Sequence, residues 1–350
     1  MSAIIAAIDV GYGHVKYCSQ IGGHRGPEGM FPSVAPPATD DSWKTTGAGT
    51  VNLRVLPVAV KDKVFMIGED GADATDGRAD YRQRTSDYAK TDEYYAHHLA
   101  ALARLDQSIV DVLVVGLPMS TIGAFGAHLQ KLLTGRHQVP DVRASRPHET
   151  RSVDVRRVVV VPQPVGALFA AITENDELNG TMNIVVDTGY FTTDFICTKG
   201  KRPFPERCGA VKGGMAGFYD RLHSAAAKEY AKLCPEDTTP FELPHHVYEE
   251  LLLKPEPILD TPAGKIDLTN AVRHASDKFD EYLNAMASKV TEIHQFNRVV
   301  LAGGGARLLA PRFKARFPQM KQIFMPARPQ FAIVEGYLAA GVAMAAKAAQ

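Results

Sequence analysis

The sequence has no excess charge of either sign. Across 350 residues, 39 lysines and arginines balance 39 aspartates and glutamates. A chain without net charge has no overall field that would draw it to nucleic acid or to an anionic membrane. We therefore expect no direct nucleic-acid binding, and we expect any link to DNA to be indirect or confined to a local patch.

Cysteines and long apolar runs are also scarce. The four cysteines, Cys18, Cys197, Cys208 and Cys234, have no CxxC spacing, and we expect reduced thiols in a cytoplasmic protein. The N-terminus lacks the basic segment of a signal peptide. The longest apolar run begins at Val158, contains two prolines and is shorter than the roughly 20 residues that span a bilayer. We therefore expect no membrane partner.

The common nucleotide and metal motifs are missing as well. Neither GxxxxGK[ST] nor GxGxxG occurs in the sequence, which excludes the usual phosphate-binding loops. Two histidine pairs, His97 with His98 and His245 with His246, lack the HExxH spacing of a zinc site. We interpret these histidines as surface or helix-packing residues.

The chain does contain alternating strand and helix patterns, which favour α/β architecture. Its length is typical of two domains, each large enough to bury a core. Strands are predicted over 4–10, 15–21, 111–119, 152–163, 182–186 and 298–300, with a loop over 22–29. Helices are predicted over 91–105, 125–135, 164–175, 213–233, 268–296 and 331–350.

Two stretches about half the chain apart begin alike. DVGYGHVKYC starts at Asp9 and DTGYFTTDFIC starts at Asp187, and each follows an apolar run. An aspartate at the end of a buried strand lies at the sheet edge where ligands bind in open α/β folds. Two such turns facing one another would hold a polyphosphate, with Lys16 beside its oxygens and both aspartates near hydrated Mg²⁺.

A third glycine cluster, LAGGGARLL from Leu301, follows a predicted strand. Its three glycines have two interpretations that the sequence leaves open. They could approach the sugar and α-phosphate of a nucleotide closely, or they could form only a tight strand-to-helix turn.

Five motifs, in this order, resemble those of the actin, Hsp70 and sugar-kinase superfamily over nearly the whole chain. They are phosphate-1 (DVGYGHVK), connect-1 (VVPQPVGALFA), phosphate-2 (DTGYFTTDF), adenosine (LAGGGARLL) and connect-2 (VEGYLAAG). Each motif is weak alone, and their order makes the resemblance specific. The short chain, the DxGxxxxK form and the GGGA sequence look most similar to bacterial and archaeal actin-like proteins of the ParM/StbA plasmid-segregation type.

This resemblance implies an α/β, two-lobed actin-like ATPase fold of duplicated ribonuclease-H-like domains, with a nucleotide in the central cleft. Domain I would comprise residues 1–160 and 335–350, with a small inserted subdomain at about 31–91. Domain II would comprise residues 161–334, with a peripheral subdomain at about 218–275. ATP, or GTP in its place, would bind with Mg²⁺, and the protein would form filaments that segregate plasmid DNA through a DNA-binding adaptor.

The resemblance also implies roles for individual residues. Gln163 would orient the attacking water, where ParM carries a glutamate, and Asp9 and Asp187 would be catalytic and hold Mg²⁺ through water. The nucleotide would be bound by Gly11, Tyr12, Gly13, His14, Lys16, Thr188, Gly189, Thr192, Thr193, Gly303, Gly304, Gly305 and Glu335. Glu335 stands where a small residue is usual, so it could instead be a helix-start carboxylate. The adenine pocket is expected near the helices around Gly214 and Asn270.

Two other functions remain open on the same fold. A small-molecule kinase would need an aspartate base, whereas connect-1 offers Gln163. A non-filamentous ATPase switch or adaptor would use the same clamp without assembling. The tyrosine shared by the two turns, Tyr12 and Tyr190, is interpreted as a packing residue.

Overall fold

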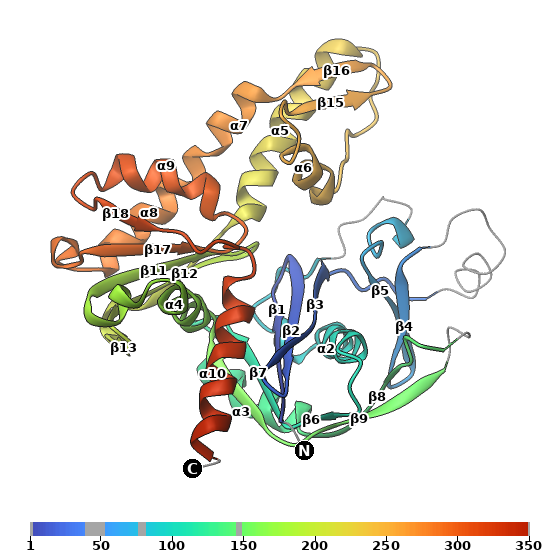
Figure 1. The fold of residues 1–350 in the computed structure, drawn as a ribbon. Coiled ribbons are helices and arrows are strands. Elements are labelled where there is room, and N and C mark those ends of the chain that lie inside the picture. Colours follow the sequence, from blue (N-terminus) through green and yellow to red (C-terminus); the bar gives the residue numbers. More distant parts are fainter. Residues whose placement is uncertain (1–2, 39–52, 76–81, 145–148, 349–350) are drawn as a thin grey trace.

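Two β-sheets, one in each lobe, organise the chain (Figure 1). The computed structural model describes residues 3–38, 53–75, 82–144 and 149–348. The predicted insertion at 31–91 therefore lies partly outside the described residues.

The sheet of lobe I has the order β10-β7-β1-β2-β3. Its strands are β1 (Ile4–Val10), β2 (His14–Ile21), β3 (His24–Pro32), β7 (Val112–Leu117) and β10 (Val158–Pro162). The first three strands are antiparallel neighbours, while β7 and β10 run parallel to β1. The predicted loop over 22–29 is wrong, because residues from His24 pair with β2. As an edge strand, β3 tolerates the proline and glycines that suggested a loop.

The sheet of lobe II repeats this topology. Its strands are β11 (Met182–Thr188), β12 (Thr192–Lys199), β14 (Gly209–Lys212), β17 (Arg298–Ala302) and β18 (Gln322–Phe324), with the short β13 (Arg202–Pro203) beside β12. Again an antiparallel hairpin is followed by two strands parallel to its first strand. The duplicated two-lobed fold expected from the motifs is therefore confirmed.

Most helices form where the sequence predicts them. Helix α2 (Asp92–Arg104) begins after Thr91, whose side chain accepts a hydrogen bond from the N–H of Tyr94. The other helices of the lobes are α3 (Ile122–Leu133), α5 (Met215–Leu233), α6 (His245–Leu251), α7 (Thr269–Ala275), α8 (Asp277–Lys289) and α9 (Ala306–Arg316). The helix predicted over 268–296 is divided at Ser276 into α7 and α8.

The strand predicted over 152–163 is likewise two strands. β9 (Thr150–Val155) pairs with β8 (Gly135–Pro140) and β6 (Ile109–Val110), whereas β10 joins the main sheet. The break falls at Arg156 and Arg157, where the chain leaves one sheet for the other.

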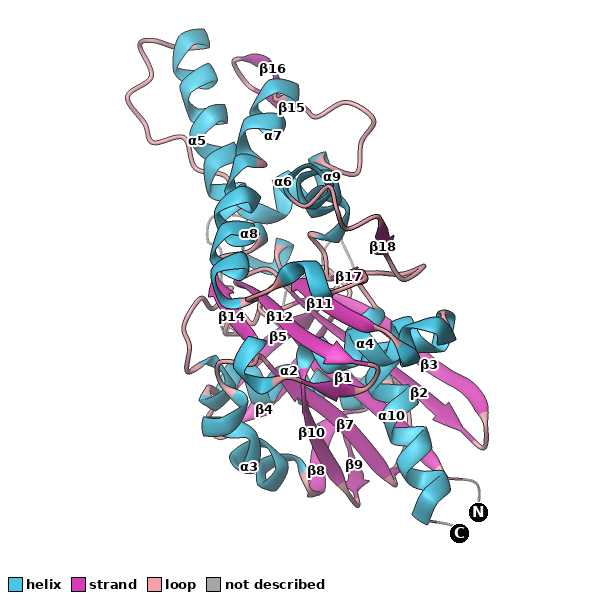
Figure 2. Ribbon diagram, turned by 90° about the vertical axis from the view of Figure 1, so that its left-hand side faces the viewer, coloured by secondary structure: helices cyan, strands magenta, loops and turns pink. Residues whose placement is uncertain are grey.

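Two hairpins lie at the periphery of the lobes. In lobe I, β4 (Val55–Val60) pairs with β5 (Lys63–Gly68) and packs on α2. In lobe II, β15 (Ile258–Thr261) pairs with β16 (Gly264–Asp267). The β15–β16 hairpin lies with α5 and α7 at the end of lobe II farthest from lobe I (Figure 2).

Two helices join the lobes by an exchange. Helix α4 (Gln163–Glu174) follows the last strand of lobe I but packs on β11, β12 and β17 of lobe II. Helix α10 (Ala332–Ala348) follows the last strand of lobe II but packs on β1, β2 and β7 of lobe I. The two helices also pack on each other, and one buried apolar cluster includes both of them and both sheets. The exact bounds predicted for domains I and II stay a prediction.

Candidate functional site

A cavity of about 500 Å³ lies between the lobes, and both repeated turns line it. The strand ends at β1 and β11 meet there because the parallel strands of each sheet point their carboxyl ends toward the other lobe. The cavity brings together twelve of the predicted site residues: Asp9, Gly11, Tyr12, Gly13, His14, Lys16, Gln163, Asp187, Gly189, Thr192, Gly303 and Gly304. Residues from four of the five motifs thus meet at this cavity, and connect-2 contributes none.

Four predicted residues do not line this cavity. Thr188 and Thr193 are buried, and the hydroxyl of Thr193 donates to the carbonyl of Gly213 (3.2 Å). Gly305 donates its N–H to the carbonyl of Thr188 (3.0 Å), behind the cavity wall. Glu335 instead forms ion pairs with Arg25 (3.1 Å) and Arg328 (3.4 Å), so its position favours a structural carboxylate in the first turn of α10.

Asp9 connects the residues of the first turn to helix α4. It is buried at the end of β1, directly across the hairpin from Lys16, and its Oδ2 lies 3.5 Å from the Lys16 Nζ. Its Oδ1 accepts a hydrogen bond from Nε2 of Gln163 (2.9 Å). Gln163 is held there because α4 begins at that residue, after Pro162. One carboxylate therefore orients both the cation and the amide.

Asp187 is the most perturbed carboxyl group of the cavity. Its Oδ1 is buried and has no hydrogen-bond partner within the described part of the chain. Burial, followed by the charges of Asp194 and Asp9, raises its pKa to about 8, although Lys16 acts in the opposite direction. Gly303 lies so close that a Cβ there would collide with this oxygen, and its φ of +85° also favours glycine.

Asp194 belongs to the same acidic group and was missed as a site residue. It stands across the β11–β12 hairpin from Asp187, as Lys16 stands across from Asp9. Its Oδ1 accepts a hydrogen bond from the N–H of Met119 (2.9 Å) in lobe I, and burial raises its pKa to about 6. The equal spacing of seven residues in the two motifs is the signal that could have identified it.

The donor groups fit a hydrated Mg²⁺ ion. Among the described residues, no group of three or more histidines, cysteines, aspartates and glutamates is arranged to hold a metal directly. However, Asp187 presents an unpartnered buried oxygen near a second carboxylate, Asp9. Mg²⁺ usually keeps several waters and takes only one or two carboxylates plus phosphates, so this pair of aspartates is sufficient.

The rest of the cavity wall comes from segments without a motif. These residues are Met30, Pro32, Arg82, Met215, Tyr219, His246, Glu249, Glu250, Leu252, Leu253, Gln330 and Ile333. Tyr190, Arg307 and Leu308 also line the cavity; they belong to the phosphate-2 and adenosine motifs but were not among the predicted site residues. Helix α5, next to Gly214, contributes Met215 and Tyr219 as expected, but Asn270 of α7 does not line the cavity. The sequence could not identify the α6 residues, because only the fold carries them to the cavity.

His14 is partly buried, with its side chain 23% exposed, and it lies near two cations of this wall. Burial, together with the charges of Arg82 and Lys16, holds its pKa well below the ordinary histidine value. The imidazole is therefore neutral at physiological pH, and it adds no positive charge to that of Lys16.

The two shared tyrosines reach across the cleft. The ring of Tyr12 packs on Phe191 of the opposite turn (centroids 4.8 Å apart), and its hydroxyl donates to the carbonyl of Thr85 (3.1 Å). Tyr190 packs against Gly13, where an added Cβ would lie 2.8 Å from the Tyr190 Cβ. Each tyrosine thus contacts the other lobe, and packing explains both.

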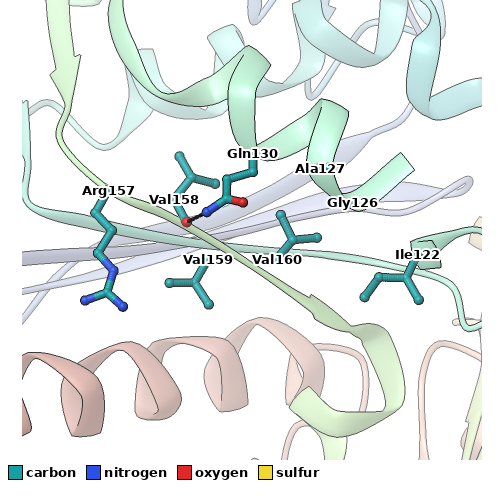
Figure 3. Close-up of a pocket in the computed structure, with 8 residues that line it drawn as sticks. All are labelled: Ile122, Gly126, Ala127, Gln130, Arg157, Val158, Val159 and Val160. Carbon is teal, nitrogen blue, oxygen red and sulfur yellow. Dashed lines mark hydrogen bonds between the residues drawn. The ribbon is translucent and has the colours of Figure 1, made fainter. Parts of the chain in front are cut away.

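A second cavity, of about 360 Å³, lies between α3 and the edge strand β10 (Figure 3). Val158, Val159 and Val160 of the strand line it, and Gln130 donates a hydrogen bond to the carbonyl of Val158 (3.1 Å). Arg157 is its only charged lining residue among those described. This cavity contains no predicted site residue and lacks the carboxylates of the first, so it is not the candidate site.

The described residues contain no helix that is both long enough and apolar enough to span a membrane. Of the two histidine pairs, His97 and His98 take the packing role expected of them, whereas His246 lines the first cavity and His245 lies 3.0 Å from Asp220. His97 and His98 are buried in α2, where His97 contacts the Tyr88 hydroxyl (3.0 Å).

Comparisons with known proteins agree with this architecture. The model of the N-terminal domain of actin-like proteins matches residues 7–166, and that of the C-terminal domain of the archaeal, MreB-like actin homologue matches residues 185–315. Together the two models match most of the chain. A sequence comparison with curated proteins gives no match.

Several solved structures have the same fold. A 15-stranded ParM filament from Clostridium botulinum is 23% identical, with a TM-score of 0.74, and the match covers 98% of this chain and 100% of that one. The archaeal actin homologue Ta0583, in complex with ADP, is 19% identical with a TM-score of 0.73, covering 97% and 99%. The ParM protein of pSK41, without nucleotide, is 20% identical with a TM-score of 0.67, covering 99% of both chains. The chain therefore belongs to the actin-like proteins and has the two-lobed fold that ParM and the archaeal actin homologues share.

Proposed function

We propose that this protein binds Mg-ATP in the cavity between the lobes, hydrolyses it and assembles into filaments. The observation that carries the proposal is the pair of turns in one cavity: Lys16 on one side, and on the other Asp187, whose buried Oδ1 has no partner among the described residues. Burial without a partner disfavours the ionised form of this carboxyl group, and a cation arriving with a polyphosphate would stabilise that form.

The chain's own residues divide the work of phosphoryl transfer. Lys16 would contact phosphate oxygens, and Gly13 and Thr192 line the same cavity. Asp9 and Asp187 would hold hydrated Mg²⁺, which supplies positive charge to the phosphates. Gln163 is oriented by Asp9 and would position the water. The water oxygen bonds to the γ-phosphorus as the bond to the β-γ bridging oxygen breaks, giving ADP and phosphate; positioning and electrostatics supply most of the catalysis.

The nucleotide base would lie toward α5, α6 and α9. Met215, Tyr219 and Leu308 provide apolar surface there, and Gly303 and Gly304 allow a close approach to the backbone. One of the solved structures of this fold contains ADP, which supports an adenine nucleotide over GTP.

We propose that ATP binding and hydrolysis control self-association of the protein. A structure with a TM-score of 0.74 is a ParM filament, and we propose that this chain also forms filaments and moves plasmid DNA through an adaptor. Its four cysteines are free thiols, which supports a reducing compartment such as the cytoplasm.

The test is sedimentation and phosphate release measured on the same samples with ATP, GTP, ADP or no nucleotide. We expect pelleting and phosphate release with Mg-ATP, and loss of both in Asp187→Asn. A matched control is Asp260→Asn, because that carboxylate is exposed in the β15–β16 hairpin. Phosphate release without pelleting would support a non-filamentous ATPase switch instead. If the wild type shows neither phosphate release nor pelleting, the proposal is overturned.

A further inference from the structure

Two residues that line the cavity, Arg82 and Glu249, form a polar contact between the lobes. Arg82, in the segment before α2, donates from Nη1 and Nη2 to the two carboxylate oxygens of Glu249 in α6, each at 2.9 Å. The Arg82 side chain is 2% exposed, the lowest value for a cation in any ion pair of the described residues. Both residues line the cavity. The pair is thus an inter-lobe contact at the site itself.

A second arginine reinforces the same contact. Arg84 lies 3.3 Å from Asp220 of α5 and 3.2 Å from Nδ1 of His245 in α6. His245 also lies 3.0 Å from Asp220. Three charged or polar side chains of lobe II thus converge on two arginines of lobe I, and we name this set, together with Tyr190, the latch: Arg82, Arg84, Tyr190, Asp220, His245 and Glu249.

Tyr190 connects the latch to the phosphate-binding turn. Its ring lies under both guanidinium groups, 4.8 Å from that of Arg82 and 5.7 Å from that of Arg84. Its hydroxyl is 2.7 Å from Nδ1 of His245. Tyr190 directly follows Gly189 in the second turn. The contacts of its ring with the two arginines therefore join this turn to lobe I.

We propose that Arg82 is a positioning residue whose pair with Glu249 holds the lobes closed over the bound nucleotide and thereby limits the rate of nucleotide release. This rests on the proposed function, since it assigns an exit step to the same cavity. Opening the lobes separates this bidentate pair, and such charge-assisted, bidentate hydrogen bonds are roughly twice as strong as those between neutral groups. Release is therefore slow while the latch is intact.

The test measures the rate at which a fluorescent ADP analogue leaves the protein, by stopped-flow chase with unlabelled ADP. We expect Arg82→Ala and Glu249→Ala to release it at least about tenfold faster, which corresponds to about 1.4 kcal/mol. The charge-exchanged double variant Arg82→Glu with Glu249→Arg should return the rate toward that of the wild type. Arg221→Ala is the matched control, because Arg221 pairs with Glu281 on the exposed surface of lobe II alone.

Melting temperatures separate this role from a merely structural one. If Arg82→Ala lowers the melting temperature and leaves the release rate unchanged, the pair only stabilises the fold and the proposal is overturned. An unchanged rate in Glu249→Ala would overturn it too. If the wild type binds no nucleotide, the proposed function fails first. The latch is then judged from small-angle scattering of the free protein, where Arg82→Ala should increase the radius of gyration, and an unchanged radius contradicts it.

Discussion

At the scale of single residues, Gln163 has a role that activity can test. Its amide donates a hydrogen bond to Asp9 (2.9 Å) and lines the cavity. The side chain is uncharged, so it adds no electrostatic attraction for the nucleotide. We expect Gln163→Ala to lower the rate of ATP hydrolysis roughly 10²-fold, as loss of a water-positioning group does, with little change in nucleotide affinity. Single-turnover hydrolysis and equilibrium binding measure the two effects.

Gln130→Ala provides the control for that variant. Gln130 also donates a single hydrogen bond, to the carbonyl of Val158, but at the second cavity. Its hydrolysis rate should equal that of the wild type. Equal rates in Gln163→Ala and Gln130→Ala would remove Gln163 from the mechanism.

The raised pKa of Asp187 predicts how stability depends on pH. The folded protein keeps a proton on this carboxyl up to a pH of about 8, whereas the unfolded chain loses it near the ordinary value of 3.8. The folded state therefore binds more protons between these values, so its free energy of unfolding falls as the pH rises through that window. The slope from one such group is on the order of 1 kcal/mol per pH unit.

Urea denaturation of the nucleotide-free protein between pH 5 and pH 8 checks this slope. Asp187→Asn should lose less stability across the range than the wild type does. Some slope should remain below a pH of about 6, because Asp194 also has a raised pKa. Parallel curves for the two proteins would mean that Asp187 is ionised throughout.

Two neighbouring glycines form a matched pair. At Gly303 a Cβ would collide with the Asp187 carboxylate and the Thr188 carbonyl, and φ is +85°. At Gly304 an added Cβ would meet no described atom within 4 Å. We expect Gly303→Ala to destabilise the protein by about 1–3 kcal/mol and to weaken nucleotide binding, while Gly304→Ala leaves the free energy of unfolding nearly unchanged. Equal denaturation midpoints for the two variants would contradict this.

The sequence identified most polar site residues of the motifs, although not Asp194, and few site residues outside the motifs. Asp9, Lys16, Gln163 and Asp187 meet in one cavity, because each lies at a strand or helix end that its motif marks. Arg82 and Glu249 belong to no motif. They are 167 residues apart in the sequence and become neighbours only when the two lobes come together. Glu335 was placed by its motif, yet its charge is used in ion pairs with Arg25 and Arg328.

At the scale of elements, local pattern predicted the buried strands and the longer helices. It failed where tertiary pairing decides. The glycines and proline of β3 read as a loop, and the run of valines in β10 read as one strand with β9. An edge strand has only one partner and tolerates such residues, and nothing local indicates that a chain changes sheets at Arg156.

Where α4 and α10 cross, we expect one added methyl group to lower the free energy of unfolding considerably. A Cβ at Gly336 would collide with the carbonyl of Gly166, and one at Gly166 with the carbonyl of Ile333. We expect Gly336→Ala to destabilise the protein by about 2 kcal/mol or more, although alanine is the better helix former. Gly123→Ala in α3, where no described atom lies within 4 Å, should be neutral or stabilise by about 0.5–1 kcal/mol. Chemical denaturation compares the two.

At the scale of the whole molecule, the shared apolar cluster links the stability of the lobes. It joins Ile5 and Val114 of one sheet, Val185 and Val300 of the other, and both exchanged helices. Neither sheet can lose its covering helix without exposing buried apolar surface. We therefore expect one calorimetric unfolding transition for the nucleotide-free protein. Two resolved transitions would show that each lobe is stable alone.

The exchange of α4 and α10 also bears on the ancestry of the chain. Each half of the sequence supplies three antiparallel strands, two parallel strands and a last helix that covers the other half. Two copies of such a half would form a closed, swapped homodimer, and joining them end to end gives the present topology. In such a dimer both hairpins would carry the same residue at the position of Lys16 and Asp194. A single chain, by contrast, can carry different residues at the two positions, and here one side of the site has a cation and the other a carboxylate.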